Sequence, residues 1–242
     1  MKRARSRSSS KVRKVRKSTP SIVSVYRNPV SRVYAASNYA GTVAYSGVTA
    51  PDRTIVKMKY SQFNQLTAAV NPFAVQIYRG NSIFDPDQTG IGHQALGHDQ
   101  WANLYEAYRV LSSSIIVYFT SQDSVDSQLV VICPSEESST IDSGNPDTYC
   151  ETPYSKHSYI SVRGGQDKAT LMSSMTTAQM LGIRRLDSGF DEAALFGNNP
   201  SAGASWFWHV YVATRTNQPN AEIHTTITYT VELLKRKQLT AS

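Results

Sequence analysis

Two aspartates and a glycine in the segment DPDQTG, residues 85–90, have the spacing that opens a calcium-binding loop. Asp85, Asp87 and Gly90 fit positions one, three and six of the pattern D-x-D-x-x-G. The glutamate that such a loop requires at position twelve is missing, because Leu96 stands there. We therefore expect a turn closed by Asx-type hydrogen bonds and assign no metal ligand, while a weak ion site shared between subunits stays open.

The chain also contains histidines, which are the commonest metal ligands and acid–base groups of proteins. These are His93, His98, His157, His209 and His224. His93 and His98, with the adjacent Asp99, are five residues apart in a loop, and this spacing fixes no ligand geometry. None of the five forms the H-x-H pair that a cupin-type metal enzyme would show. We expect His224 to be an ordinary residue on the polar face of the last strand.

Nucleotide-binding and nucleophile motifs are missing from the sequence. Gly90 and Gly92 belong to a Pro- and Asp-containing loop, and their spacing is not G-x-G-x-x-G. The sequence has neither a Walker loop nor a serine in G-x-S-x-G. Cys133 and Cys150 are too few for a disulfide scaffold or a zinc site, and the sequence leaves open whether they pair. We predict a chain that is not an enzyme and needs no cofactor.

The strongest chemical signal is the opening stretch MKRARSRSSSKVRKVRK. It holds nine basic residues and no acidic ones, whereas residues 18–242 hold 16 basic and 18 acidic residues, a net charge of −2. Because like charges repel, we expect a flexible arm whose partner is a polyanion. The residues predicted to bind nucleic acid are Lys2, Arg3, Arg5, Arg7, Lys11, Arg13, Lys14, Arg16 and Lys17.

Nucleic acid is a better partner for this arm than a membrane. Val12 and Val15 are its only large apolar residues besides the initial methionine, so no apolar face can enter a bilayer, and no apolar segment of a secretory signal is present. Mobile point charges neutralise phosphates but do not read base edges, so binding should tolerate any sequence. The segment KVRKVRK is also typical of a nuclear localisation signal. That signal would consist of Lys11, Arg13, Lys14, Arg16 and Lys17.

The remaining sequence has the pattern of a β protein. We divide the chain into an arm with its linker at residues 1–50 and one domain at residues 51–242. In the first strand Val56, Met58 and Tyr60 face one way while Lys57 and Lys59 face the other. Strands are predicted at residues 54–60, 73–78, 110–120, 128–133, 159–163, 169–173, 206–213 and 222–234.

Two helices are predicted among these strands. Residues 98–108 place Trp101, Leu104, Tyr105 and Tyr108 on one helical face, with Asp99 as the N-cap. Residues 176–179, TTAQ, have capping-box spacing and should open a short helix that ends at Gly182. The tryptophans Trp101, Trp206 and Trp208 are expected in the core or at subunit contacts rather than as base-stacking platforms.

About eight strands with long connections and without a βαβ rhythm favour a two-sheet sandwich. The predicted fold class is therefore all-β: an eight-stranded antiparallel jelly-roll sandwich with one or two short helices and a disordered basic arm. This reading leaves open a non-viral nucleic-acid-binding module and a sugar-binding or enzymatic jelly roll.

Several segments resemble the capsid proteins of circular Rep-encoding single-stranded DNA viruses, the circovirus-like group. The resemblance lies in YRGNSIFDPD (residues 78–87), GIGHQALGHDQW (90–101), LYEAYRVL (104–111), WFWHV (206–210) and residues 229–242. It spans the arm and nearly all of the body, and rests on a pattern of loops and strands rather than on a catalytic signature. It does not distinguish single viruses, and satellite-virus capsids that hold single-stranded RNA share the architecture.

The resemblance implies a capsid protein that self-assembles into a T=1 icosahedral shell of sixty copies around circular single-stranded DNA. It implies a virion protein. The KVRKVRK segment adds an expected passage through the host nucleus during assembly, with nuclear import receptors as further partners, and the lack of an apolar face predicts no membrane insertion. Residues 79–97, 134–153 and 184–204 would form the outer surface and the subunit contacts. Lys57 and Lys59 would add positive charge if their face points inward. A satellite-type capsid protein that packages RNA is the alternative.

Overall fold

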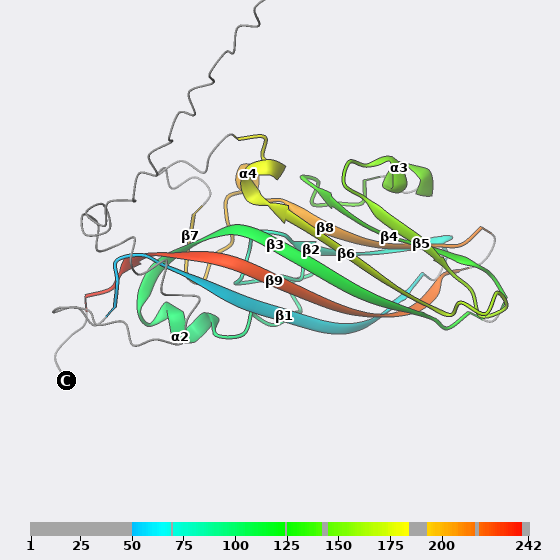
Figure 1. Cartoon of the computed structure of the whole chain (residues 1–242), viewed down its shortest axis with the longest axis horizontal. Coiled ribbons are helices and arrows are strands. Elements are labelled where there is room, and N and C mark those ends of the chain that lie inside the picture. The colour runs from blue at the N-terminus through cyan, green and yellow to red at the C-terminus, as the bar shows by residue number, and fades with distance from the viewer. Residues whose placement is uncertain are drawn as a thin grey trace, which may run out of the picture. The chain divides into compact units, whose positions relative to one another are not determined.

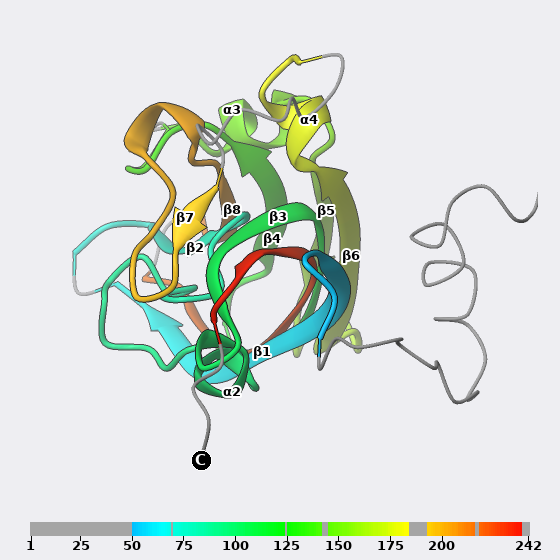
Figure 2. The same ribbon diagram turned by 90° about the vertical axis from the view of Figure 1, so that its left-hand side faces the viewer.

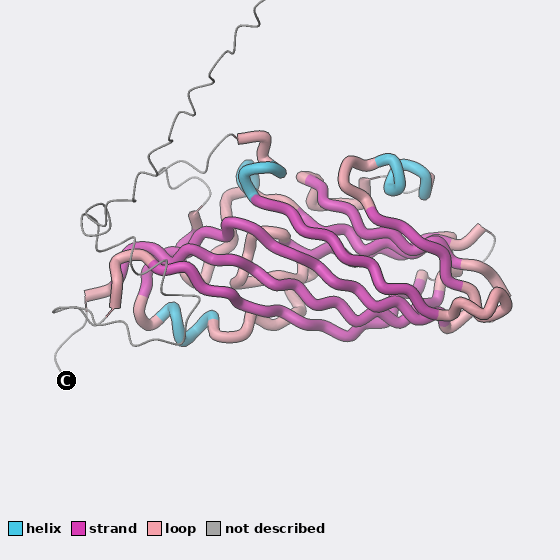
Figure 3. The backbone as a smooth tube through the Cα atoms, viewed as in Figure 1, coloured by secondary structure: helices cyan, strands magenta, loops and turns pink. Residues whose placement is uncertain are grey.

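Two antiparallel sheets lie face to face in the computed structural model, with long strands in the front layer of Figure 1 and both layers visible in Figure 2. The structure describes residues 50–238 except 69, 124, 142–144, 184–192 and 216–217. The front sheet has the order β1-β9-β3-β6 and the second sheet the order β2-β8-β4-β5. Figure 3 shows that strands make up most of the described chain.

The strands of the front sheet are long. They are β1 (Thr54–Thr67), β9 (Asn220–Arg236), β3 (Tyr105–Ser121) and β6 (Lys168–Thr176), and the short β7 (Ala194–Leu195) pairs with the beginning of β3. The second sheet consists of β2 (Phe73–Arg79), β8 (Phe207–Ala213), β4 (Gln128–Ser135) and β5 (Lys156–Ile160). All pairings are antiparallel, and β3 carries an irregularity between Val110 and Ser112.

The strand order identifies the fold. With the two-residue β7 set aside, one sheet contains the first, eighth, third and sixth strands and the other contains the second, seventh, fourth and fifth. The chain thus crosses repeatedly between sheets and returns each strand beside one that is remote in sequence, which is the double Greek key of a jelly roll. The predicted fold class is confirmed in its two antiparallel sheets and its few short helices.

The core forms between the sheets from residues that alternate along the strands. In β9, Ile223, Ile227 and Tyr229 are buried on one face, as the strict alternation of this segment predicts. Trp206 and Trp208 are also fully buried, with ring centroids 5.2 Å apart in an edge-to-face arrangement. The expected core role of these two indoles is confirmed.

Hydrogen bonds satisfy both buried indoles. Trp208 Nε1 donates to Ser113 Oγ at 2.9 Å, and Trp206 Nε1 donates to Thr177 Oγ1 at 3.3 Å. Gly80 lies directly against the Trp206 ring, so that a Cβ atom there would overlap the indole. The loop after β2 therefore packs closely on the core at a position where only glycine fits.

The helices are short: α2 (His98–Ala102), α3 (Pro146–Glu151), α4 (Thr177–Met180) and the 3-10 turn η2 (Ala202–Ala204). The predicted cap of α4 is confirmed, because Thr176 Oγ1 accepts a hydrogen bond from the Gln179 backbone N–H. The sequence analysis missed α3, whose N-cap is Asn145 and whose first residue is Pro146. Among the described residues, no helix has the length and apolar character needed to cross a bilayer.

The predicted helix over residues 98–108 is wrong beyond Ala102. The N-cap is Gly97, at φ 91°, rather than Asp99, and β3 already begins at Tyr105. Tyr105 and Tyr108 are both fully buried in the strand, where the ladder to β9 supplies hydrogen bonds that a longer helix would have made internally. Tertiary pairing has overridden a local spacing that also suits a helix.

The other strand boundaries differ mostly at their ends. β5 spans Lys156–Ile160 instead of residues 159–163, because Ser161 to Gln166 form a tight turn closed by an isolated bridge. β1 continues to Thr67, seven residues beyond the predicted end, paired with β9 throughout. This extension brings Phe63 onto the outward face of the front sheet.

Candidate nucleic-acid interface

The nine basic residues predicted to bind nucleic acid, and the nuclear localisation signal among them, lie outside the described residues. The structure does define where that arm joins the domain. Arg236 Nη1 donates to the Ala50 carbonyl at 2.9 Å, and Tyr105 Oη donates to the Pro51 carbonyl at 2.9 Å. The arm is therefore linked to the start of β1, an edge strand of the front sheet.

The outward face of the front sheet is formed by five cross-strand rows of four residues. Their members come from β1, β9, β3 and β6 in that order, and all are described. The rows are Lys57–Thr230–Ser112–Thr176, Lys59–Thr228–Ser114–Ser174, Ser61–Thr226–Ile116–Met172, Phe63–His224–Tyr118–Thr170 and Gln65–Glu222–Thr120–Lys168. Eleven of the twenty side chains carry a hydroxyl group, so this face is rich in uncharged hydrogen-bonding groups.

One row places three rings next to one another on this face, and we call Phe63, His224 and Tyr118 the aromatic row. Phe63 is 67% exposed and Tyr118 is 49% exposed. Tyr118 stacks on His224 with ring centroids 6.0 Å apart and an interplanar angle of 29°. His224 Nε2 also lies 2.9 Å from Ser61 Oγ. The histidine between the two exposed rings is thus held on both sides.

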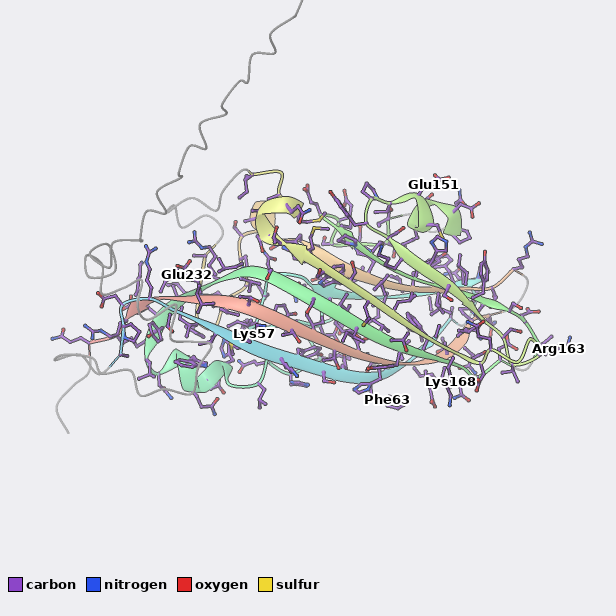
Figure 4. All side chains as sticks on the ribbon, viewed as in Figure 1. Lys57, Phe63, Glu151, Arg163, Lys168 and Glu232 are labelled. Carbon is purple, nitrogen blue, oxygen red and sulfur yellow. The ribbon has the colours of Figure 1, made fainter. Side chains whose placement is uncertain are left out.

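The next row continues the apolar surface. Met172 is 63% exposed, and Ile116 is half-buried beside it in the register of β3 and β6. Figure 4 labels Phe63 on β1 and Lys168 at the beginning of β6, on either side of this part of the sheet. Exposed apolar residues here form a contiguous area rather than isolated side chains, which marks a contact surface.

A hollow of about 240 Å³ lies two rows from these rings, and we call it the polar hollow. Hydroxyl groups from three neighbouring strands line it together with the Lys57 ammonium and the Gln179 amide. The residues that present these hydroxyl groups are Ser112, Ser114, Ser174, Thr176, Thr228 and Thr230, whereas the hydroxyl of Ser113, which also borders the hollow, accepts a hydrogen bond from the buried Trp208 Nε1. Such a set of neutral donors beside one cation suits a phosphate group.

The charge of the outward face is mildly positive. Lys57 and Lys59 lie on one face of β1, as the alternation predicts, and Lys168 stands at the opposite corner. Glu222 is the only acidic residue in the five rows, which gives a net charge of +2 over these described positions. The positive net charge of this face therefore favours the binding of a polyanion.

In the segment DPDQTG (residues 85–90), whose spacing resembles a calcium-binding loop, both carboxylates interact with other residues of the chain. Asp87 Oδ1 accepts from the Thr89 N–H at 3.0 Å, the Asx-type bond that the sequence analysis favoured. The same carboxylate accepts from Gln62 Nε2 and Gln76 Nε2, both at 2.8 Å. Asp85 forms a 2.8 Å ion pair with Arg79. Among the described residues, no three His, Cys, Asp or Glu side chains converge as a metal site would require.

The histidines of this segment are likewise engaged. His98 Nδ1 lies 2.9 Å from Asp99 Oδ1, and the buried ring packs edge-on against Phe196. His93 contacts backbone oxygens through both ring nitrogens, those of Gln94 at 2.7 Å and Ser61 at 3.0 Å. These contacts fix the loop before α2 rather than assemble a ligand set.

The outward face of the second sheet differs, because the segment containing α3 packs on it. Tyr149 of α3 stacks on Tyr211 of β8 with centroids 4.1 Å apart. His209 is fully buried beneath, where its Nε2 lies 2.9 Å from the Glu137 carbonyl while Nδ1 has no hydrogen-bond partner. Burial lowers the pKa of His209, and the hydrogen bond to Glu137 opposes that shift.

Both cysteines belong to this second layer as free thiols. Burial raises the pKa of the Cys133 thiol to about 12. Burial also raises the pKa of Cys150, and the nearby Asp147 carboxylate adds to that shift. Neither thiol is therefore activated as a nucleophile, since the thiolate is the reactive form.

Phe63, Tyr118 and Met172 were not among the predicted site residues. The phase of β1 would have placed Phe63 with Lys57 and Lys59 once the strand was extended by three residues. Tyr118 and Met172 carry no comparable signal, because their place beside Phe63 depends on β9 lying between β1 and β3. Sequence alone does not reveal that neighbourhood.

No protein-family model matches the chain, and no curated protein matches its sequence. Among solved structures, it is similar to a chain of Desmodium yellow mottle tymovirus, with 10% identity, 84% of this chain and 100% of that chain covered, and a TM-score of 0.41. It is also similar to the 60-mer BFDV capsid protein, with 12% identity, coverage of 78% and 97%, and a TM-score of 0.42.

A third similarity is to the semi-empty virus-like particle of the giant freshwater prawn Macrobrachium rosenbergii nodavirus. It has 10% identity, covers 82% of this chain and 100% of that chain, and has a TM-score of 0.43. With identities near 10% and TM-scores below 0.5, none of these similarities identifies a family. The jelly-roll assignment rests on the strand order of this chain.

Proposed function

We propose that this chain is a viral capsid protein that self-assembles into a small icosahedral shell and packages single-stranded DNA through its basic arm. The observation that carries the proposal is the combination of a complete jelly-roll domain with a polycationic arm joined to its edge strand. Nine positive charges are concentrated in seventeen residues, while the rest of the chain has a net charge of −2. Nucleic-acid binding is thus assigned to the basic arm, and assembly of the shell is assigned to the jelly-roll domain.

Assembly is supported by a loop that presents apolar side chains on a fixed backbone. Ile91 is 87% exposed and Leu96 is 82% exposed. The Leu96 N–H donates to the Lys59 carbonyl at 2.9 Å, and the Ala95 N–H donates to the Ile83 carbonyl at 3.0 Å. A loop tied to β1 in this way offers apolar groups to a neighbouring subunit at little further cost in conformational entropy.

Partial charge neutralisation is consistent with packaging. Sixty arms with nine charges each would neutralise about 540 phosphates at one charge per nucleotide. A genome of roughly one or two thousand nucleotides would then need counter-ions or further basic residues of the shell. The choice of DNA over RNA, and a passage through the host nucleus directed by Lys11 to Lys17, follow from the sequence resemblance and belong to the same proposal.

The test is expression of the full chain followed by electron microscopy and analysis of the nucleic acid that copurifies. We expect closed particles of one size whose contents are degraded by DNase but not by RNase. Particles with RNase-sensitive contents would replace DNA by RNA in the proposal. A chain that sediments as a monomer at high concentration, with and without added oligonucleotide, would contradict the capsid function.

A further inference from the structure

We propose that the outward face of the β1-β9-β3-β6 sheet is a second nucleic-acid-binding site, in which the aromatic row stacks on bases and the polar hollow holds phosphates. The inference rests on the proposed function and deepens it, because it assigns the face of the folded domain that meets the single strand. The arm contributes nine positive charges. The sheet face supplies a fixed surface that recognises unstacked bases.

Base stacking is the interaction for which the aromatic row is suited. Phe63 and Tyr118 flank His224 on adjacent strands, so their Cα atoms stand about 9.5 Å apart across the sheet. Both rings are exposed, and every base offers a π-face that can cover them. In a duplex those base faces already stack on one another, so the aromatic row selects single strands.

Phosphate binding is assigned to the polar hollow on the same face. Lys57 lies six residues from Phe63 along β1, or about 20 Å, so a bound strand of several nucleotides can span both features. Six residues with outward hydroxyl groups and Gln179 line the hollow together with Lys57, its single cationic residue. Serine and threonine hydroxyls are frequent partners of phosphate oxygens, and they give binding that ignores base identity.

The composition of the face favours nucleic acid over a second copy of the chain. Lysine and serine are depleted in the cores of protein interfaces, and this face contains three lysines and four outward serines in its five rows. Its net charge of +2 complements a polyanion, and residues 1–17 of the same chain carry a further net charge of +9. Glu232, at the end of the sheet, is neutralised by Arg109 at 2.7 Å.

The experiment separates the face from the arm within the full-length chain. All nine basic residues of the arm are changed to glutamine, and fluorescence anisotropy measures binding of a labelled oligothymidylate of about 20 nucleotides and of an abasic oligomer of equal length. We call the chain with these nine glutamines the arm-neutral chain. We expect it to bind oligothymidylate at least about tenfold more tightly than the abasic probe, because only oligothymidylate has bases that can stack on the aromatic row. Phe63→Thr combined with Tyr118→Thr should abolish that preference.

Two control variants define the site. Tyr159→Thr removes an equally exposed ring, 63% exposed, from β5 of the other sheet and should leave the preference unchanged. Lys57→Gln should weaken both probes equally and reduce the salt slope by about 0.7, because it removes one phosphate contact. Unchanged thermal unfolding midpoints show that the substitutions act on binding rather than on folding.

Each contrary outcome is distinguishable from failure of the proposed function. If the arm-neutral chain binds both probes equally, or if the double substitution leaves the preference intact, the sheet-face site is wrong while binding by the arm stands. If the double substitution changes particle assembly and leaves the preference unaltered, the face is a contact between copies and the inference falls. If the unmodified chain binds neither probe, the proposed packaging function itself fails.

Discussion

The Arg109 guanidinium and the Glu232 carboxylate meet across the β3–β9 ladder with Nη2 and Oε2 2.7 Å apart. Arg109 Nε donates a second hydrogen bond to Oε2 at 3.3 Å, and both side chains are almost completely buried. The pair lies where β1, β9 and β3 come together beside the attachment of the arm. A charge at this position is stable only as long as its partner remains.

Glu232→Gln should therefore destabilise the folded chain strongly. The substitution keeps the shape of the side chain but removes the carboxylate charge 2.7 Å from the buried Arg109 cation, which costs about 3 kcal/mol. Urea denaturation of unassembled chain measures the loss in free energy of unfolding. Glu106→Gln, at an exposed position of β3, the strand that carries Arg109, is the matched control and should change stability by less than about 0.5 kcal/mol. Equal effects of the two changes would contradict a special role for the pair.

His209 should make the folded domain sensitive to mild acid. Its pKa in the folded chain is lowered by burial, so below its ordinary value of 6.5 the unfolded chain binds a proton that the folded chain does not. Stability is then complete above that value and falls as the pH is lowered through it. His209→Gln can keep a hydrogen bond to the Glu137 carbonyl but cannot titrate. The variant should lose this part of the pH dependence between pH 7.5 and 5.5 in denaturant titrations.

Replacing both exposed apolar residues of the loop before α2 should prevent assembly without unfolding the chain. In the variant Ile91→Asp with Leu96→Asp, the two side chains remain in water in the free subunit, but burying them against a neighbour would remove two carboxylates from water. Sedimentation should show a folded species of low mass instead of particles. Ile91→Leu with Leu96→Ile keeps the apolar surface and should still assemble. Particles formed by the aspartate variant would show that this loop is not a subunit contact.

The basic arm should make binding of single strands strongly dependent on salt. If all nine charges contact phosphates, the slope of log K against log salt concentration is roughly −6. The three lysines of the sheet face add about −2, which gives the unmodified chain a slope of about −8, and glutamine at the nine arm positions should leave only the sheet-face contribution of about −2. Titrations between about 50 and 200 mM salt measure both slopes. A slope that is unaffected by the substitutions would remove the arm from the binding mechanism.

The alternating pattern of the sequence was sufficient to predict most of the sheets. In β9 the buried positions follow the predicted phase from Ile223 to Leu233, because one side faces the core and the other faces water along the whole strand. At residues 98–108 the spacing of apolar residues instead led to a wrong prediction, a helix where β3 begins. There Tyr105, Ala107 and Tyr108 are all buried, because both faces of this end of β3 are covered, and such a strand loses the period of two.

The sheet face was less predictable than the fold. Lys57 and Lys59 could be placed on one side of a strand from their spacing alone. The aromatic row depends on Phe63, His224 and Tyr118 being in register across three strands whose sequences are far apart. Register over such distances is set by the closing of the whole sandwich, which no local pattern contains. The charge of the arm, by contrast, could be read from the sequence directly, because it depends only on amino-acid composition.

The pairing of β1 with β9 has a consequence for biosynthesis. Thr54 pairs with Leu233, about 180 positions later in the chain, and β9 also separates β1 from β3. The front sheet therefore cannot form on the ribosome until residues 220–236 have emerged, long after the polycationic segment is exposed. Newly made chains pass through a period in which they can bind RNA near the ribosome but have no completed sandwich. Until β9 has been made, β1 and β3 lack the strand that lies between them, and unpaired strand edges of this kind favour aggregation.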